Sequence, residues 1–493
     1  MLVVGAGFAG LLVARELVRA GRRVTVVERG GLKRHADQLR DGIDEVDTPT
    51  ARHALLAGPE QPDYPWNVVH AVGGGSLRWA GVAPRLLPSD FALRSDHGVG
   101  RDWPVGYDEL EPYYAEAERL LLVAGGESPL HPRSAPLPQP AHPFSPADRI
   151  VAEAMAPFGP LPQARLSEPV GERAACCANT NCGLCPVDAK TTMLHVLDGE
   201  RLLEDPRLDL QPGLAVARLL VQGSAVTGVE CLDAARDRVR FDARTVVLAA
   251  GGFGNPAILL ASGLDGPAVG RFLNDHSHRL LHVELDRPFG AGRGAAHATG
   301  ISWAHADGDW RDRRASQIVI PVNAGLLDRD LVRDGILDGS LRGGGLARLR
   351  ERFERTLTLD ILGEDLPSGD RRVELSPKRD RLGLPRVRVR YPDDSPYLEE
   401  ARRALIADVE RRLAPLGARV VAAERVAEGS HQLGTCFMGD DGVVDRDTRH
   451  HRLENLFVTG GSAFPTYSAH HPTLTICALA LRLGRLLAGS AAP

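Results

Sequence analysis

The first thirty residues alternate between apolar runs and a helical pattern. Leu2–Val4 is a short apolar run, and apolar residues recur at helical spacing along Leu11–Ala20, with charged residues between them. Gly21 marks the end of this helix, and Val24–Val27 is a β-branched run typical of a second strand. The order strand, glycine-rich turn, helix and strand predicts that the chain begins with an α/β domain.

Strand-like patterns return in the middle of the chain, and helical patterns follow toward its end. A meander is predicted over Leu214–Val221, Ala225–Leu232 and Val239–Leu248, and its last strand leads into a helix at Ala257–Ser262. Further strands are predicted at Gln317–Val322, Arg372–Leu375 and Arg386–Tyr391, and further helices at Pro396–Leu416 and Thr473–Leu487. Residues 31–70 carry only a weak polar pattern, and the Pro-, Ala- and Ser-rich residues 125–170 are interpreted as an excursion.

Composition excludes several classes of protein. The 493 residues are 43% hydrophobic and 25% charged, which is typical of a soluble globular protein with two or three domains. The net charge of −5 gives no basic surface for nucleic acid. No segment reaches the ~18 continuous apolar residues of a membrane span. A core strand that begins at residue 2 argues against a signal peptide, so we expect a cytoplasmic protein.

A glycine motif lies between the first predicted strand and helix. Gly5 would make the tight turn, Gly7 would let a pyrophosphate approach the backbone, and Gly10 would let the helix pack closely on the strand. Glu28 closes the second strand, where a carboxylate accepts hydrogen bonds from both ribose hydroxyls and repels the 2′-phosphate of NADP. A glycine-rich turn without a ligand is the alternative, and the motif alone does not separate FAD from NAD.

Two later segments repeat the pattern of an apolar strand followed by glycines. One ends in Ala250-Gly251-Gly252 and the other in Gly460-Gly461. Chains that return to a nucleotide this often usually wrap a large cofactor, which favours FAD over NAD.

Seven segments together resemble the glucose–methanol–choline (GMC) oxidoreductases, which are FAD-dependent enzymes that oxidise alcohols. In the family's order they are GAGFAG (5–10), VGGGSLRWAG (72–81), VVLAAGGFGNPAILLASG (246–263), VGRFLNDH (269–276), HQLGTCFMG (431–439), NLFVTGGSAFPT (455–466) and HHPTLT (470–475). With VGRDWPVGYDELEPYY (99–114), they most resemble the bacterial branch around gluconate, fructose and glucose dehydrogenases and pyranose oxidase.

The resemblance implies a Rossmann-like FAD-binding domain of the GMC and p-hydroxybenzoate-hydroxylase type, joined to an α+β substrate domain on an antiparallel sheet. The FAD domain is expected over 1–95, 190–275 and 440–493, the excursion over 96–189 and the substrate domain over 276–439. The expected cofactor-binding residues are Gly5, Gly7, Phe8, Ala9, Gly10, Glu28, Gly74, Ser76, Trp79, Ala80, Gly81, Val216, Ala250, Gly251, Gly461, His471 and Thr473. In some relatives a histidine before the tryptophan binds FAD covalently. Arg78 stands there in this chain, so non-covalent FAD is expected.

Oxidation of an alcohol requires a base for the hydroxyl proton and a second group to hold the developing alkoxide. The resemblance to the family implies a candidate residue for each of these two roles. His431 opens the H-x-x-G-T motif, where relatives keep a catalytic histidine, and His471 stands where relatives have Asn or His. We predict that His431 is the general base and that His471 is the hydrogen-bond partner of the substrate oxygen. An arrangement in which the two histidines share these roles is the alternative. His470 is expected to point elsewhere, because neighbouring side chains of an extended chain alternate.

Four cysteines fall within ten residues: Cys176, Cys177, Cys182 and Cys185. Thiolates at such short spacing bind iron–sulfur clusters or zinc. The segment resembles the cysteine-rich stretch of bacterial fructose and glucose dehydrogenases, which implies an iron–sulfur cluster that passes electrons to an acceptor protein. A structural zinc, a disulfide and inert thiols are the alternatives.

The sequence therefore predicts an FAD-dependent dehydrogenase, rather than an oxidase, for a small polyhydroxylated substrate. It would oxidise an alcohol of a sugar, sugar acid, glycoside or aminoglycoside-like amino sugar to a carbonyl, with hydride transfer to flavin N5, and in some cases on to an acid. An NAD-linked alcohol dehydrogenase and a non-catalytic FAD or iron–sulfur electron-relay subunit are the alternatives.

Overall fold

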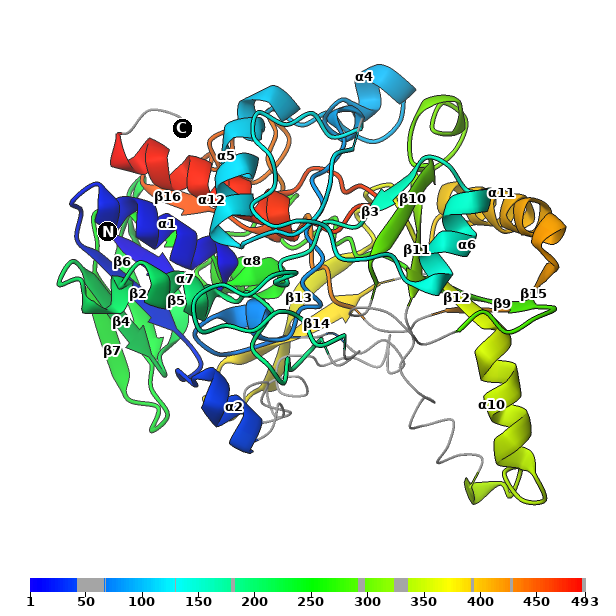
Figure 1. Cartoon of the computed structure of the whole chain (residues 1–493). Helices are drawn as coiled ribbons and strands as arrows, with labels where there is room; N and C mark the ends of the chain where they lie inside the picture. The colour runs from blue at the N-terminus through cyan, green and yellow to red at the C-terminus, as the bar shows by residue number, and fades with distance from the viewer. Residues whose placement is uncertain are drawn as a thin grey trace.

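A parallel five-stranded sheet forms one half of the molecule, and an antiparallel six-stranded sheet forms the other (Figure 1). The computed structural model describes residues 1–41, 66, 68–128, 130–178, 182–290, 298–322, 336–391, 394–425 and 429–489. The two sheets confirm the predicted fold class, an α/β domain with a second, antiparallel sheet.

The parallel sheet brings together strands from both ends of the chain. Its order is β16 (Leu456–Val458), β8 (Val246–Leu248), β1 (Leu2–Val4), β2 (Val24–Glu28) and β4 (Leu208–Pro212). Strands β1, β8 and β16 have three residues each, all apolar and buried. This is expected for a parallel sheet that is covered on both faces. Helix α1 (Phe8–Arg19) packs against α12 (Thr473–Ala488), and α5 (Tyr107–Leu120) packs on α12 in turn. The first and last helices of the described chain are therefore neighbours (Figure 1).

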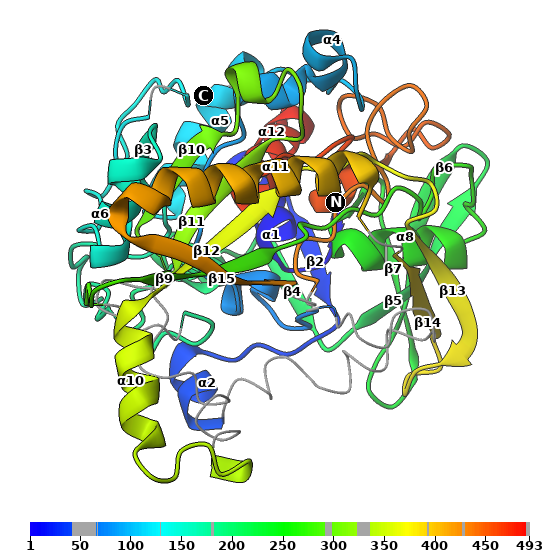
Figure 2. The same cartoon turned by 90° about the vertical axis from the view of Figure 1, so that its right-hand side faces the viewer.

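The antiparallel sheet carries its own apolar core. Its order is β15 (Ala418–Arg425), β9 (Arg279–Leu285), β12 (Thr356–Gly363), β11 (Gln317–Val322), β10 (Gly300–His305) and β3 (Phe158–Pro160). Helices α11 (Pro396–Leu413) and α6 (Pro146–Ala154) pack on this sheet, and Figure 2 shows α11 lying across it. Both β3 and α6 come from the predicted excursion, which thus adds an edge strand and a covering helix to this sheet.

The remaining elements lie outside these two sheets. Strands β5 (Ala215–Gln222), β6 (Ala225–Leu232) and β7 (Arg238–Asp242) form a three-stranded meander, and β13 (Arg372–Arg379) pairs with β14 (Pro385–Arg390). The other α-helices are α2 (His35–Asp41), α4 (Leu93–His97), α7 (Met193–Gly199), α8 (Gly251–Ala261) and α10 (Gly345–Arg355). The 3₁₀ helices are η2 (Gly74–Leu77), η3 (Pro88–Phe91), η4 (Leu202–Glu204), η5 (Gly308–Trp310), η6 (Ala414–Leu416) and η7 (Gly461–Ala463).

One predicted strand, Val239–Leu248, is wrong. The segment holds two strands, because β7 ends at Asp242 and β8 begins at Val246 in a different sheet. The amide of Ala243 donates to the carbonyl of Thr227, after which polar residues let the chain leave the meander. Within the described residues, no helix combines the length and apolar character that a membrane span requires.

Candidate active site

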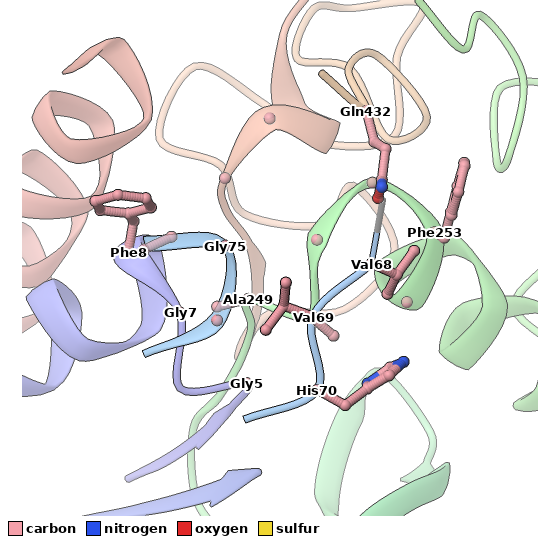
Figure 3. Close-up of a pocket in the computed structure, with 18 of the residues that line it drawn as sticks. Gly5, Gly7, Phe8, Val68, Val69, His70, Gly75, Ala249, Phe253 and Gln432 are labelled. Atoms are coloured by element: carbon pink, nitrogen blue, oxygen red, sulfur yellow. The ribbon is translucent and has the colours of Figure 1, made fainter. Parts of the chain in front are cut away.

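A cavity of about 670 Å³ is lined by residues from both halves of the molecule. Figure 3 shows the part beside the parallel sheet, where the turn from Gly5 to Phe8 faces Val68, Val69 and His70 across the opening. Its other wall includes His278, one residue before β9, and Asp360 of β12. The cavity therefore connects a nucleotide-type turn with a group of titratable side chains.

The glycines of the first turn have different structural roles. Gly5 has φ of +101°, and a Cβ there would lie 2.5 Å from the carbonyl oxygen of Ala249. A Cβ at Gly10 would lie 1.9 Å from the carbonyl oxygen of Gly5, so α1 packs directly on the turn. A Cβ at Gly7 would meet only the Cα of Gly74, at 3.9 Å. The fold itself requires Gly5 and Gly10, whereas Gly7 leaves open space at the cavity wall.

The N-terminus of α1 suits a negatively charged group. The first helical hydrogen bond joins the amide of Leu11 to the carbonyl of Gly7 at 3.1 Å. The amides of the preceding turn have no partner within the helix, and this turn contains no acidic residue that would repel an anion. Gly7 and Phe8 line the cavity at this point, so the geometry fits a pyrophosphate on the helix N-terminus.

Glu28 lies at the end of β2 with its carboxylate held in place by the backbone. One oxygen accepts from the amide of Ala6 at 2.9 Å, and the other accepts from the amide of Gly30 at 2.8 Å. Burial raises the pKa of Glu28 to about 7, against these two hydrogen bonds. A carboxylate has about four lone-pair sites, so two remain for the hydroxyls of a ribose.

The glycine-rich loop at η2 closes over the same turn. Gly74 has φ of +51°, and a Cβ there would lie 2.8 Å from the Cα of Gly7. The ring of Trp79 packs edge-on against Phe8, with 4.9 Å between ring centroids, and its indole nitrogen donates to the carbonyl of Thr191 at 3.1 Å. The backbones of Gly74 and Gly7 thus approach so closely that a side chain at position 74 would not fit.

Most of the residues expected to bind the cofactor surround this cavity. Those that line it are Gly5, Gly7, Phe8, Ala9, Glu28, Gly74, Trp79, Ala80, Val216, Ala250, Gly251, Gly461, His471 and Thr473. Gly10, Ser76 and Gly81 are not among the lining residues. Ser76 instead supports the loop from behind, since its hydroxyl donates to the carbonyl of Gly73 at 2.6 Å and accepts from the amide of Met193 at 3.0 Å.

Sequence reasoning missed part of the cofactor side. Val68, Val69 and His70 line the cavity (Figure 3) but lie in a segment with a weak polar pattern. Their position depends on a bridge between Gly31 and Ala71, beyond the end of β2. A single bridge between distant residues leaves no periodic pattern from which the contact could be inferred.

The structure brings the two predicted catalytic histidines together. The rings of His431 and His471 both line the cavity, with 5.3 Å between their centroids. Burial, together with the neighbouring histidines, lowers the pKa of His431 well below its ordinary value. His431 is therefore neutral at neutral pH and has a lone pair that can accept a proton. The ring of His470 points away from this pair and packs against His131, with 5.3 Å between centroids.

A histidine–aspartate pair lies beside these rings and was not predicted. The Nδ1 atom of His278 is 3.1 Å from both carboxylate oxygens of Asp360, and the His278 ring is 6.2 Å from that of His431. Burial alone would lower the pKa of His278, but the Asp360 carboxylate raises it above its ordinary value. A lone acid within the buried strand TLTLDILG (356–363) was the available signal, because charged residues are rarely buried without a partner.

The four clustered cysteines are not arranged as a ligand set. Cys182 accepts from the guanidinium of Arg165 at 2.8 Å, Cys185 accepts from the amide of Ala189 at 3.2 Å, and Cys177 is exposed. Across the residues that the structure describes, which leave out 179–181 in this segment, no group of three or more His, Cys, Asp or Glu side chains could hold a metal ion. The prediction of an iron–sulfur cluster on Cys176, Cys177, Cys182 and Cys185 is therefore not supported.

Comparisons with known proteins agree with this geometry. Two sequence profiles of GMC oxidoreductases match residues 2–278 and 367–480. The fructose dehydrogenase large subunit of Gluconobacter japonicus is 29% identical over 98% of this chain and 96% of its own length. The 6'''-hydroxyparomomycin C oxidase of Streptomyces lividus is 32% identical over 99% of this chain and 90% of its own length. Paromamine 6'-oxidase of Streptomyces fradiae is 31% identical over 99% of this chain and 91% of its own length.

A solved structure shares the fold. Pyridoxine 4-oxidase from Mesorbium loti superposes with a TM-score of 0.68 over 99% of both chains, at 20% identity. The profile matches extend over more than half of this chain and include the glycine turn, and the match over 367–480 includes His431 and His471. They favour FAD over the NAD-linked alternative, because the GMC family binds FAD. The chain belongs to the GMC oxidoreductase family and is an FAD-dependent oxidoreductase that acts on CH–OH groups.

Proposed function

We propose that this enzyme oxidises an alcohol group of a sugar, sugar acid, glycoside or aminoglycoside-like amino sugar to a carbonyl, with FAD bound without a covalent link. The observation that carries the proposal is the neutral His431 ring beside His471 on the wall of the large cavity, with the contacting pair of His278 and Asp360 next to it.

The cavity residues fit FAD along its length. The N-terminus of α1 would hold the pyrophosphate, and Glu28 would hold the adenosine ribose. The loop at Trp79 would border the rest of the FAD molecule. Arg78 lines the same wall, and a guanidinium does not form the flavin link that a histidine forms in some relatives. When bound, FAD supplies the acceptor for the hydride that leaves the substrate carbon.

Side chains of the protein would accept the proton of the substrate and stabilise the charge that develops on its oxygen. A ring nitrogen of His431 takes the hydroxyl proton of the alcohol, while His471 donates a hydrogen bond to the substrate oxygen. The substrate would thus lose one proton to His431, and bound FAD would supply the acceptor for the hydride, so that a carbonyl is left. His278 lies 6.2 Å from His431 between ring centroids, and its protonated form, which Asp360 favours by raising the pKa, would stabilise the negative charge that builds up on the oxygen.

The substrate class is supported by polar lining and by the relatives' names. His278, Asp360, Ser430 and Gln432 offer donors and acceptors on one side of the cavity, as a polyhydroxylated molecule requires. The relatives named above act on fructose and on aminoglycosides. They include both a dehydrogenase and oxidases, and we favour a dehydrogenase that passes its electrons to a separate acceptor protein.

The test is a screen for anaerobic bleaching of the bound flavin. Fructose, gluconate, glucose, paromamine and a hydroxyparomomycin are mixed in turn with the oxidised enzyme. At least one should reduce the flavin, and oxygen, a quinone and a dye then compete to reoxidise it. Acid precipitation should release the yellow cofactor into the supernatant. Bleaching only by simple aliphatic alcohols, or flavin retained in the pellet, would contradict the proposal.

The His431→Ala variant tests the base directly. Its flavin reduction by the best substrate should be slower by about 10²–10⁴-fold, since this is the usual contribution of a general base. His451→Ala is the matched control, because His451 is exposed and lies outside the cavity, and it should react like the wild type. A His431→Ala rate close to the wild-type rate would remove His431 from the mechanism.

A further inference from the structure

A third histidine, His276, contacts His431 from behind the cavity wall. Its ring is 1% exposed, and both of its nitrogens are engaged. The Nε2 atom is 2.6 Å from the backbone carbonyl oxygen of Ser468, and the Nδ1 atom is 2.8 Å from Nδ1 of His431. His276 does not line the cavity, and its ring contacts the cavity residue His431 through a short nitrogen–nitrogen distance.

The partners of His276 determine where its proton lies. A carbonyl oxygen only accepts hydrogen bonds, so Nε2 of His276 carries a proton and donates it to Ser468. Burial, reinforced by the nearby charge of His278, lowers the pKa of His276 to about 3, so the ring is neutral and has this one proton. Its Nδ1 is therefore bare and accepts a hydrogen bond.

The same reasoning determines which ring nitrogen of His431 carries the proton. In the 2.8 Å contact between the two Nδ1 atoms, one must donate, and the bare atom belongs to His276. The proton therefore lies on Nδ1 of His431. Because His431 is also neutral, its Nε2 has the free lone pair. The opposite arrangement would set the Nε2 lone pair of His276 against the Ser468 oxygen at 2.6 Å, which leaves two buried acceptors facing each other.

The other nearby acceptor does not take this role. The Asp275 carboxylate accepts from the backbone amide of His431 at 2.8 Å, but it lies 3.9 Å from Nδ1 of the ring, beyond hydrogen-bond distance. Asp275 thus holds the main chain of His431, and His276 holds its ring.

We propose that His276 is a positioning residue that fixes His431 in the tautomer with Nδ1 protonated, so that Nε2 is bare to take the substrate's hydroxyl proton. The proposal rests on the role of His431 in the proposed function. When Nε2 gains that proton, the ring becomes an imidazolium and its Nδ1–H bond to His276 becomes charge-assisted. The bond is then stronger in the transition state than before the reaction, which is the condition for it to speed the chemistry.

Three substitutions separate the two hydrogen bonds of His276. In His276→Asn, the amide oxygen is placed to replace Nδ1 as acceptor, and the bond to Ser468 is lost. In His276→Gln, the amide nitrogen is placed to replace Nε2 as donor, and the acceptor for His431 is lost. His276→Leu removes both. A hydrogen bond to a charged group contributes enough to change a rate by about 10- to 100-fold.

The measured quantities are the limiting rate of anaerobic flavin reduction and the substrate concentration at half-saturation. We expect His276→Asn to stay within about threefold of the wild-type rate, and His276→Gln and His276→Leu to be about 10- to 100-fold slower at similar half-saturation. A role in packing alone predicts that Gln performs as well as Asn. A His276→Gln enzyme as fast as wild type would overturn the proposal.

The tautomer is also observable without turnover. Nitrogen-15 NMR of the oxidised holoenzyme, labelled at its 17 histidines, distinguishes protonated from bare ring nitrogens, and comparison with His431→Ala identifies the His431 signals. We expect a protonated Nδ1 and a bare Nε2 in the wild type and in His276→Asn, and a mixed pattern in His276→Gln. A protonated Nε2 on His431 in the wild type would refute the proposal.

This second measurement separates the two hypotheses. If His431→Ala reduces flavin normally while the NMR pattern is as expected, the proposed base is wrong and the tautomer assignment stands. If His431→Ala is inactive while Nε2 of His431 is protonated in the wild type, His431 is still supported as the base, but the proposed role of His276 is wrong.

Discussion

The two sheets contribute different kinds of group to one cavity. The parallel sheet offers open space at Gly7, backbone amides at the start of α1 and a single carboxylate, Glu28. The antiparallel half offers side chains that can be charged, Asp360 of β12 and His278 just before β9. A cofactor common to a family can be held by backbone and shape, whereas a particular substrate must be distinguished by side chains. The cofactor half should therefore be sensitive to added bulk, and the substrate half to lost charge.

The largest effect is expected from two glycines of the parallel half. Gly10→Ala places a Cβ 1.9 Å from a backbone oxygen, so α1 must move, and we expect a loss of about 3 kcal/mol or more in the free energy of unfolding. Gly7→Ala meets no atom closer than 3.9 Å, so the fold should keep its stability while the methyl group at the cavity wall weakens FAD binding. Urea unfolding of the apoprotein and FAD content of the purified protein measure the two effects. Equal losses of stability in both variants would contradict this difference.

A smaller effect is expected from Asp360→Asn in the antiparallel half. Removal of the charge that stabilises His278 should lower kcat/KM about tenfold or more while leaving FAD content unchanged. The matched control is Asp408→Asn, because Asp408 also pairs with a buried histidine, His305, at 2.8 Å but lies outside the cavity. It should affect stability without affecting kcat/KM. A similar loss of kcat/KM in both variants would show that the Asp360 effect is not specific to the cavity.

The same pair predicts a pH dependence of stability. Because Asp360 raises the pKa of His278 in the folded protein, its stabilising effect is complete below the ordinary value near 6.5 and is lost as the pH rises through the folded pKa. The difference in free energy of unfolding between wild type and Asp360→Asn should thus be larger at pH 5.5 than at pH 9.

The smallest effect is expected from Glu28→Gln. Glu28 has a pKa of about 7 before the ribose binds, and hydrogen bonds from the ribose hydroxyls to the ionised carboxylate should lower it. FAD affinity of the wild-type apoprotein should then be full above pH 7 and weaken as the pH falls below it. Glu28→Gln should bind about tenfold more weakly at pH 8 and show a flatter profile. Fluorescence titration with FAD at pH 6 and pH 8 measures both, and an unchanged pH profile in the variant would count against this role of Glu28.

Local patterns predicted the elements that their own apolar runs define, even where the strands pair with distant partners. β1, β6 and β11 have the bounds expected from their apolar runs, and the glycine motif correctly predicted the tight turn at Gly5 and the close helix packing at Gly10. The site side chains that sequence reasoning missed depend on distant pairing. Asp360 faces His278 only because β12 pairs with β9 in a particular register, with Asp360 opposite Leu280. The cysteine spacing likewise suggested a metal site, but spacing does not specify that Arg165 and Ala189 engage two of the thiols.

The packing of α1 against α12 bears on how the protein is made. The glycine turn is synthesised before Gly461, His471 and Thr473, which line the same cavity and lie more than 450 residues later in the chain. A nascent chain can form the first strand and helix long before these residues exist. The flavin site is therefore incomplete until the chain has been synthesised as far as Thr473, and free cofactor must be available from that stage onward.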